Sequence, residues 1–390
     1  MLIQEEKDLM TELEAIWKDE ELFWSQRSRV SWLKEGDKNT NFFHTSTVHR
    51  KQRNKIASLK DDQGNIIIQQ EEIADHVSNH FQSHFTKSTP APDTCILEDF
   101  PKLVTDEMNF DLCKPPTEEE IKSAVFDLGQ NKSPGPDGFA GLFFRKFWTK
   151  IKGDLCTEVI DFFSSSIMPE GWNIALIPKV QSPESVCQFS LINCCNFRYK
   201  VISKIMTSRL KIWMSSLVLD TQTAFTGGRM IQDNIILVNE ILHNFKNRRT
   251  SGNWDMMMKL DMRKAYDLVD WDCLEAILQA YSFDGKWRGW VSQCISTVSF
   301  SVLLNGNPTE YFSPTRGIPQ GDPLSHFPFI IMSNALSFLI KKGVQKGDIQ
   351  GIKLNQNCPT VSHCLFADDT VIFGKASMRE NMLKTPLKEE

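Results

Sequence analysis

Apolar positions recur at helical spacing in some parts of the chain. Between residues 5 and 24, large apolar side chains return at steps of three and four, which predicts an amphipathic helix. Residues 271–281 follow a helical pattern as well. Thr117 and the glutamates after it predict a helix start, with Thr117 as the N-cap and Glu120 at the capping-box position. Residues 86–116 hold five prolines and few apolar runs, so we interpret them as a linker or loosely packed crossover.

Short continuous apolar runs predict strands elsewhere. Residues 256–261 form a run that suits a buried strand ending in a carboxylate. Residues 361–373 are apolar except around two adjacent aspartates, which predicts two strands flanking a tight acidic turn. Residues 60–65 form a turn between apolar pieces, which predicts a hairpin. Asn305-Gly306 predicts a second hairpin turn, since this pair favours the backbone that tight hairpins need.

The composition excludes several classes of protein. Hydrophobic residues make up 41% and charged residues 24%, which is ordinary for a globular chain and excludes a wholly disordered one. No run approaches the roughly 18 apolar residues of a membrane span, so no membrane partner is expected. The cysteines form no Cys-x-x-Cys pair of the kind that zinc fingers use. A net charge of −5 argues against a protein that coats nucleic acid by charge alone.

That net charge hides a strongly basic segment between residues 27 and 60. Its cations, which include Arg50, Lys51 and Arg53, are opposed only by Glu35 and Asp37. Aromatic side chains are interleaved among them, and phosphate neutralisation combined with stacking is how single-stranded RNA is commonly held. The segment therefore predicts an RNA-binding strip, although a solvated basic helix packed by its aromatics explains the same pattern.

Asp261, Asp368 and Asp369 are the strongest candidates for chemistry. Each stands at the end of an apolar segment, where clustered bare carboxylates repel one another and lose hydration. A divalent cation removes both costs, and Mg²⁺ accepts a few carboxylate oxygens together with water and substrate phosphates. Two such ions about 4 Å apart can support phosphoryl transfer. Taken alone, an Asp-Asp pair is more often a simple turn.

Three motifs resemble motifs A, B and C of reverse transcriptases, in the family's order. They are residues 259–267 (KLDMRKAYD), 316–325 (RGIPQGDPLS) and 366–369 (FADD). Upstream stretches resemble plant LINE-type non-LTR retrotransposons and include residues 32–44, 132–138, 176–179, 224–229 and 233–234. The resemblance covers the chain from about residue 20 to residue 375.

The resemblance implies an α+β fold, a right-hand polymerase whose antiparallel palm sheet is packed by helices. It divides the chain into an N-terminal extension with the acidic helix and basic strip (1–112), fingers (113–250) and a palm with motifs A to C (251–390). Only 21 residues follow Asp369, so the thumb is expected to be absent and the chain to be a truncated copy.

The resemblance also assigns roles around the active site. Asp261, Asp368 and Asp369 would be the catalytic carboxylates, holding two Mg²⁺ ions for which Mn²⁺ could substitute. Tyr266 would be a steric gate that excludes a ribose 2′-hydroxyl. Gln320 and Gly321 match the motif B pair that lies against the incoming nucleotide. Without the resemblance, a tyrosine here is more often a core residue, and Gln320-Gly321 is an ordinary glycine turn before a helix.

Basic residues complete the implied binding surfaces. Lys179 matches the fingers lysine that contacts the triphosphate, while Arg229 and Arg316 are candidates for phosphate or template contacts, for which the guanidinium fork is suited. A surface ion pair is the alternative for either arginine. The implied partners are an RNA template, a DNA primer and deoxynucleoside triphosphates, and no signal for an oligomeric state is present. An intracellular ribonucleoprotein that reaches the nucleus is a family expectation.

The chain departs from the family pattern at several positions. Ser190 stands where the family has an arginine that contacts the triphosphate, and losing one charge-assisted hydrogen bond weakens binding roughly 10–100-fold. Pro319 and His326 replace the Arg and Pro that close relatives have in motif B. Two alternatives to a polymerase therefore stay open: a catalytically inactive retrotransposon relic that at most binds RNA, and a splicing maturase.

Overall fold

The structure is a computed structural model, which describes residues 2–28, 40–87, 94–168, 172–180, 183–247 and 255–376. The chain forms two compact units. The first comprises Met1–His80, Ile174–Leu191 and Ser301–Glu310, and the second comprises Phe81–Asn173, Ile192–Phe300 and Tyr311–Glu390. Helices and strands are mixed, as the α+β prediction requires. The division into extension, fingers and palm stays a prediction.

The first unit combines helices with short strands. Its helices are α1 (Leu2–Ser28), α2 (Thr40–Arg53), most of α3 (Gln70–His84) and the short η2 (Val186–Gln188). Two short strands, β1 (Leu59–Lys60) and β2 (Ile66–Ile67), form one sheet. The unit also holds most of a sheet ordered β4-β3-β6-β7, whose strands are β3 (Trp172–Pro178), β4 (Phe189–Cys195), β6 (Phe300–Leu304) and β7 (Asn307–Pro308). Both predicted hairpins are confirmed, since β1 pairs with β2 and β6 with β7, each antiparallel. Asn305 and Gly306 both have positive φ, 54° and 96°, as their turn demands.

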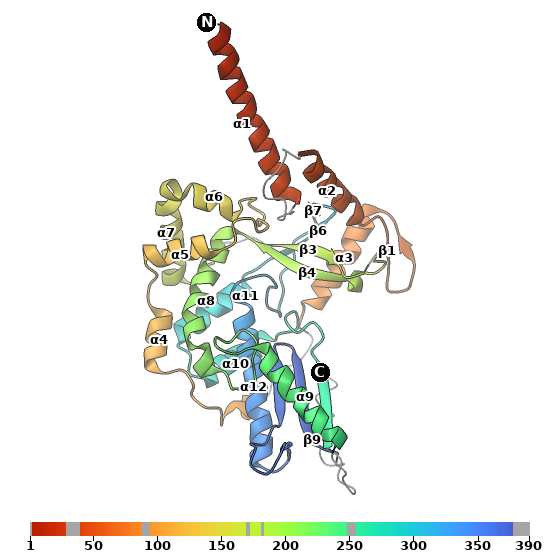
Figure 1. Cartoon of the computed structure of the whole chain (residues 1–390), viewed down its shortest axis with the longest axis vertical. Helices are drawn as coiled ribbons and strands as arrows, with labels where there is room; N and C mark the ends of the chain where they lie inside the picture. Colours follow the sequence, from red (N-terminus) through yellow and green to blue (C-terminus); the bar gives the residue numbers. More distant parts are fainter. Residues whose placement is uncertain are drawn as a thin grey trace. The chain divides into compact units, whose positions relative to one another are not determined.

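The predicted N-terminal helix is confirmed as α1, a long straight helix (Figure 1). Its large apolar side chains from Leu9 to Phe23 are exposed, and Leu9 keeps 65% of its surface accessible. Near its end α1 packs against α2, where the rings of Trp24 and His44 meet edge to face with centroids 4.4 Å apart. Arg50 of α2 donates to the carbonyl oxygen of Ser28. Residues 29–39, which include Glu35, Asp37 and part of the basic segment, lie outside the described residues.

The second unit is mainly helical. Its helices are η1 (Thr94–Leu97), α4 (Asp106–Cys113), α5 (Glu118–Asp127), α6 (Gly141–Lys146), α7 (Trp148–Ser165), α8 (Phe197–Leu217), α9 (Ile231–Asn247), α10 (Trp271–Ala280), α11 (Gly285–Ser296) and α12 (His326–Gln345). The core is rich in aromatic side chains, and Trp287, Trp290, Tyr199 and Tyr281 are fully buried. Such large side chains contribute much of the apolar area that a core removes from water.

A buried arginine joins three helices of this unit. The Thr117 hydroxyl accepts from the Glu120 amide at 3.2 Å, which confirms Thr117 as the N-cap of α5. The Glu120 carboxylate pairs with Arg209 of α8 through two bonds of 2.8 and 2.9 Å. Arg209, 5% exposed, also donates to the carbonyl oxygens of Leu112 and Lys114 at the end of α4. Paired donors and acceptors of this kind offset part of the cost of burying a charge.

The prediction of a loosely packed crossover over residues 86–116 is wrong for the part that the structure describes. This stretch contains η1 and α4, and Leu112 is completely buried. The amide of Val104 donates to the carbonyl oxygen of Tyr281 at 2.9 Å. The pattern misled because α4 is short and buries few side chains, too few for a period to show. Residues 88–93, with two of the prolines, lie outside the described residues.

A three-stranded antiparallel sheet carries the predicted acidic turn. Its order is β5-β9-β8, formed by β5 (Asp255–Asp261), β9 (Asp369–Lys375) and β8 (His363–Phe366). The strand-turn-strand prediction for residues 361–373 is therefore confirmed. The helix α9 packs against this sheet (Figure 1) through an apolar cluster that includes Ile241, Cys364 and Phe373. The expected pattern of an antiparallel sheet packed by a helix is thus present.

One described helix, α12, is long and apolar enough to cross a membrane by length and composition. More than half of its apolar window is buried inside the protein. Its inward side also carries polar residues that bond to neighbouring segments, among them Ser333, Asn334 and Ser337. These contacts are those of a core helix in the second unit.

Candidate active site

Strand pairing brings two of the sequence-predicted carboxylates together. Asp261 is the last residue of β5, Asp369 is the first residue of β9, and their Cα atoms are partners in the β5–β9 register. Asp368 precedes Asp369 in the turn that joins β8 to β9. Asp261 and Asp368 are exposed and Asp369 is half-buried. The three aspartates thus stand at one end of one sheet, although motif B separates them in the chain.

A lysine to which the sequence pattern assigned no role lies in this acidic cluster. The Lys259 ammonium forms an ion pair of 3.0 Å with the Asp369 carboxylate. The hydrogen bond and charge of Asp369, with smaller contributions from Asp261 and Asp368, raise the pKa of Lys259. The signal for this residue was available, because alternate residues of a strand share a face and Lys259 stands two before Asp261.

The carboxylates suit an ion that is held jointly with a substrate. Within the described part of the chain, no group of three or more His, Cys, Asp or Glu side chains is arranged to enclose a metal ion. Mg²⁺ rarely needs such a cage, because it binds one or two carboxylates and completes its shell with water and phosphate oxygens. The exposed oxygens of Asp261 and Asp368 meet that requirement. Asp369 bonds to Lys259, so its role as a ligand stays a prediction.

The segment that follows α8 packs against the strand that leads into the acidic turn (Ala367 and Asp368). The amide of Leu365 donates to the Thr221 carbonyl at 2.8 Å, and Gln222 and Leu365 form a parallel bridge. The buried Asn234 side chain donates to the carbonyls of both Thr221 and Leu365, at 2.9 and 3.1 Å. The strand that leads into Asp368 is thus clamped from a second segment. In the sequence, Asn234 was visible only as part of a family motif, with no role of its own.

The turn after β5 places Tyr266 beside the acidic end of the sheet. Its carbonyl accepts from the Ile318 amide at 2.8 Å, and its ring stacks on Phe329 with centroids 4.8 Å apart. Burial of the ring, together with the negative charge of Asp368, raises the pKa of Tyr266 to about 12. The phenol is therefore neutral at physiological pH. Its role as a steric gate stays a prediction.

Motif B is bonded to the same turn through Asp267. The Gln320 amide nitrogen donates to one Asp267 oxygen at 2.6 Å, and His84 Nε2 lies 3.4 Å from the other. Asp267 is only 4% exposed, so the bond from Gln320 replaces a hydrogen bond to water that this carboxylate has lost. Gln320 is therefore oriented by motif A, a link that the sequence did not reveal.

The backbone of motif B approaches neighbouring segments closely. Gly321 has φ +99°, and a Cβ at this position would lie 3.4 Å from the carbonyl oxygen of Asn193. The Asn193 amide donates to the Gln320 carbonyl at 2.9 Å. Asp322 follows and is buried, and this burial raises its pKa to about 6. The contacts of Gln320 and Gly321 with a nucleotide stay predictions.

The two arginines predicted to bind nucleic acid already bond to backbone carbonyls. Arg229 donates to the carbonyl oxygens at the end of α8 and just beyond, which are those of Ser215, Val218, Leu219 and Gln222. Arg316 donates twice to the His84 carbonyl, from Nε at 2.9 Å and Nη2 at 2.7 Å. Each guanidinium thus donates to backbone carbonyl oxygens. Those that Arg229 binds lie at or just beyond the C-terminus of α8, where carbonyls lack a partner within the helix. Their contacts with phosphate stay predictions.

The remaining predicted basic residues belong to the first unit. Lys179 directly follows β3 and is exposed, and its amide donates to the Gln188 carbonyl at 2.8 Å. Lys51 and Arg53 are exposed in the last turn of α2, whereas Arg50 is half-buried against Ser28. Lys51 and Arg53 are therefore better placed to meet a ligand in solution than Arg50.

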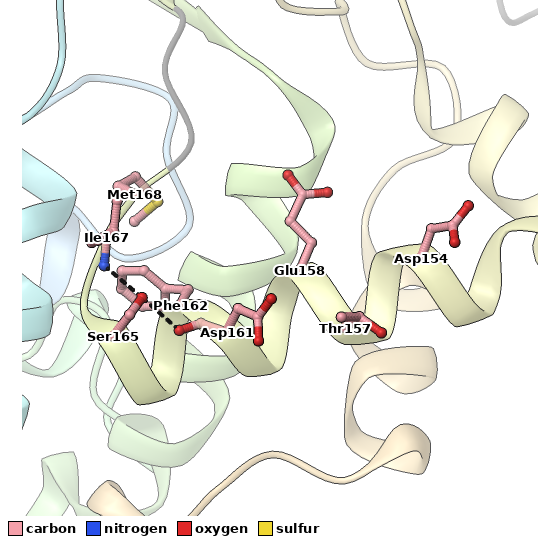
Figure 2. A pocket seen from close by; sticks show the side chains of 8 residues that line it. All are labelled: Asp154, Thr157, Glu158, Asp161, Phe162, Ser165, Ile167 and Met168. Carbon is pink, nitrogen blue, oxygen red and sulfur yellow. Dashed lines mark hydrogen bonds between the residues drawn. The ribbon is translucent and has the colours of Figure 1, made fainter.

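The pocket drawn in Figure 2 is distinct from the acidic turn. It measures about 590 Å³ and its lining consists of Asp154, Thr157, Glu158, Asp161, Phe162, Ser165, Ile167 and Met168. The Ser165 hydroxyl donates to the Asp161 carbonyl and accepts from the Ile167 amide, at 2.7 and 3.2 Å. Three carboxylates follow one another along α7 here and would repel phosphate, so we do not assign this pocket to a nucleotide.

The sequence of this chain is similar to those of known proteins. Residues 177–389 match the family described as reverse transcriptase (RNA-dependent DNA polymerase). The chain is 27% identical, over 90% of its length, to the transposon TX1 uncharacterized 149 kDa protein of Xenopus laevis. It is 24% identical, over 67% of its length, to a retrovirus-related Pol polyprotein from the type-2 retrotransposable element R2DM of Drosophila melanogaster. The chain spans 26% and 23% of these two relatives. A short stretch, 17% of the chain, is 43% identical to an uncharacterized mitochondrial protein of Arabidopsis thaliana.

Proposed function

Because the chain belongs to the reverse transcriptase (RNA-dependent DNA polymerase) family, we propose that it joins deoxynucleotides to a primer 3′-hydroxyl on an RNA template. One observation carries the proposal. Asp261 of β5 is the register partner of Asp369, and the exposed Asp368 stands next to it in the turn. Motifs A and C therefore present their carboxylates at the same end of one antiparallel sheet.

The proposed chemistry divides between a metal and the chain's own residues. When bound, two Mg²⁺ ions would activate the primer hydroxyl and stabilise the developing charge on the phosphate. Asp261 and Asp368 would hold those ions through oxygens that face solvent. Tyr266, stacked on Phe329, would place a neutral ring beneath the sugar and exclude a 2′-hydroxyl. Gln320 and Gly321 would line the nucleotide, and Lys179 would contact its triphosphate.

In this proposal the second unit holds most of a palm domain. We further infer from the upstream motifs that the chain derives from a plant LINE-type non-LTR retrotransposon. RNA template, DNA primer and deoxynucleoside triphosphates are the proposed partners, and an intracellular ribonucleoprotein that reaches the nucleus is the proposed setting. Ser190, half-buried in β4, replaces a family arginine, so we expect weak use of the triphosphate.

Primer extension tests the proposal. The full chain is incubated with an RNA template, a DNA primer, deoxynucleotides and Mg²⁺. Asp261→Asn and Asp368→Asn should each lower incorporation by about 100-fold or more, because a neutral amide holds Mg²⁺ less well than a carboxylate and the ions stabilise the charge of the transition state. Asp154→Asn is the matched control, since Asp154 is an exposed aspartate on α7, away from the acidic turn. Incorporation that persists in the Asp368 variant would refute the assignment.

An inactive wild-type chain that still binds RNA would instead favour the relic. Its binding should fall steeply with salt, because phosphate contacts release counterions. Reversing the charges of Lys51 and Arg53 should then weaken binding, whereas Asp368→Asn should not. Arg50 is left unchanged in this experiment, because it bonds to the carbonyl of Ser28 and its loss would disturb the packing of α1 on α2.

A further inference from the structure

We propose that Gln222 is a positioning residue that holds the acidic turn in the conformation that places Asp368 beside Asp261. The catalytic consequence of this role rests on the proposed polymerase function, whereas the contact itself can be tested without it. Gln222 lies in the segment between α8 and α9. It would act through the backbone of Ala367.

The Gln222 side chain is completely buried, and its oxygen accepts two backbone hydrogen bonds. The amide of Ala367 donates to Oε1 at 3.1 Å and the amide of Ala224 donates to the same atom at 3.0 Å. Nε2 donates to the Ser333 hydroxyl of α12 at 3.4 Å. Both backbone partners are donors, so only the oxygen of the amide can face them.

The turn needs such support because its first residue has an unfavourable backbone. Phe366 and Asp369 are register partners, so Ala367 and Asp368 form a two-residue turn. Ala367 has φ +59°, a left-handed conformation that glycine adopts easily and residues with a Cβ resist. As a central residue of the turn, Ala367 also lies outside the β8–β9 ladder. Gln222 supplies the acceptor that the strands do not.

The register between the two segments keeps Gln222 opposite the turn. Gln222 forms a parallel bridge with Leu365, two residues before Ala367, and the Leu365 amide donates to the Thr221 carbonyl. The same side-chain oxygen binds Ala224, next to Phe225, whose φ is also positive at 55°. One buried amide thus stabilises two strained turns, and strain of this kind persists only where neighbouring groups enforce it.

Gln222→Met tests the contact, because methionine has a similar length and volume and offers no strong acceptor. Gln222→Glu keeps an acceptor oxygen and is the conservative rescue. Asn334→Leu is the matched control. Asn334 is another fully buried amide that bonds to the same segment, and its bonds lead to the amide of Leu219 and the carbonyl of Leu217 rather than to the acidic turn.

Hydrogen exchange of the full chain gives a readout that needs no catalysis. In Gln222→Met, the amides of residues 366–369 should exchange about 10-fold faster or more, because a buried donor has lost its acceptor. Gln222→Glu should restore most of the protection, and Asn334→Leu should leave these amides protected. Equal exchange in wild type and Gln222→Met overturns the proposal. Equal loosening in Asn334→Leu also overturns it, because the turn would then follow general destabilisation.

Steady-state kinetics adds the functional readout. Gln222→Met should lower kcat for nucleotide incorporation by about 10-fold or more and raise the Mg²⁺ concentration needed, with little change in the KM for nucleotide. A raised KM with unchanged kcat would overturn the positioning role. If the wild type incorporates nothing while exchange behaves as expected, the polymerase function fails and the positioning contact stands. If Gln222→Met does not fold, Gln222→Asn, one methylene shorter, is measured instead and the same outcomes decide.

Discussion

Replacing Gly317 with alanine should disrupt the packing of motif B against the turn of motif A. The Gly317 amide donates to the Val269 carbonyl at 2.8 Å, and its own carbonyl accepts from the indole of Trp271 at 2.7 Å. Gly317 has φ +94°, and an added Cβ would lie 2.7 Å from the backbone oxygen of Asp267 and 3.1 Å from the ring of Phe85. The methyl group therefore meets backbone on one side and a buried ring on the other.

Two costs add at this position. The left-handed backbone costs a residue with a Cβ about 1–2 kcal/mol. Overpacking a tight site costs about 1–3 kcal/mol more, and a clash with a backbone oxygen cannot be relieved by rotating a side chain. The sum is about 2–5 kcal/mol, and at about 2–4 °C per kcal/mol the second unit should melt roughly 4–20 °C lower.

Scanning calorimetry of the full chain measures this shift, and Gly347→Ala is the matched control. Gly347 belongs to the same unit and has φ +76°, but an added Cβ there would meet nothing within 4 Å. Its variant should therefore carry only the backbone cost, about 1–2 kcal/mol. If both variants lower the melting temperature equally, crowding at Gly317 contributes nothing and the reasoning is refuted.

Three further predictions concern ionisable side chains that are buried or half-buried. Arg229→Ala should lower the free energy of unfolding by about 2–4 kcal/mol in urea titrations, because several carbonyls lose their donor; unchanged stability with lost RNA binding would contradict this. Burial lowers the pKa of His363 to about 4, below its usual 6.5, so the folded state resists the proton. Wild-type stability should fall as the pH drops from 6.5 to 4, by up to about 1.4 kcal/mol per unit, and His363→Gln should flatten that slope in unfolding measurements. Burial raises the pKa of Asp322 to about 6, above its usual 3.8, so ionisation of this carboxyl destabilises the fold. The free energy of unfolding of Asp322→Asn should therefore rise relative to that of wild type as the pH goes from 4 to 6. A difference between the two proteins that stays constant over this range would contradict the prediction.

Local features of this protein were readable from the sequence because they depend on residues a few positions apart. The Thr117 cap, the Asn305-Gly306 turn and the two strands around Asp368 all formed as predicted. The exception within this class is α4, whose few buried positions left no periodic signal. Motif order was readable too, and it was enough to single out Asp261, Asp368 and Asp369 as the candidate carboxylates.

The partners of individual side chains were decided only by the tertiary structure. An arginine in a sequence offers its donors equally to phosphate or to a carbonyl, and the fold directs those of Arg229 and Arg316 to carbonyls. A glutamine between two helices carries no signal of its own, yet Gln222 meets the amide of Ala367, far along the chain. The sequence determined the strands next to which the carboxylates stand. Tertiary packing decided which buried polar groups hold those carboxylates, because a buried donor must find an acceptor wherever the chain brings one.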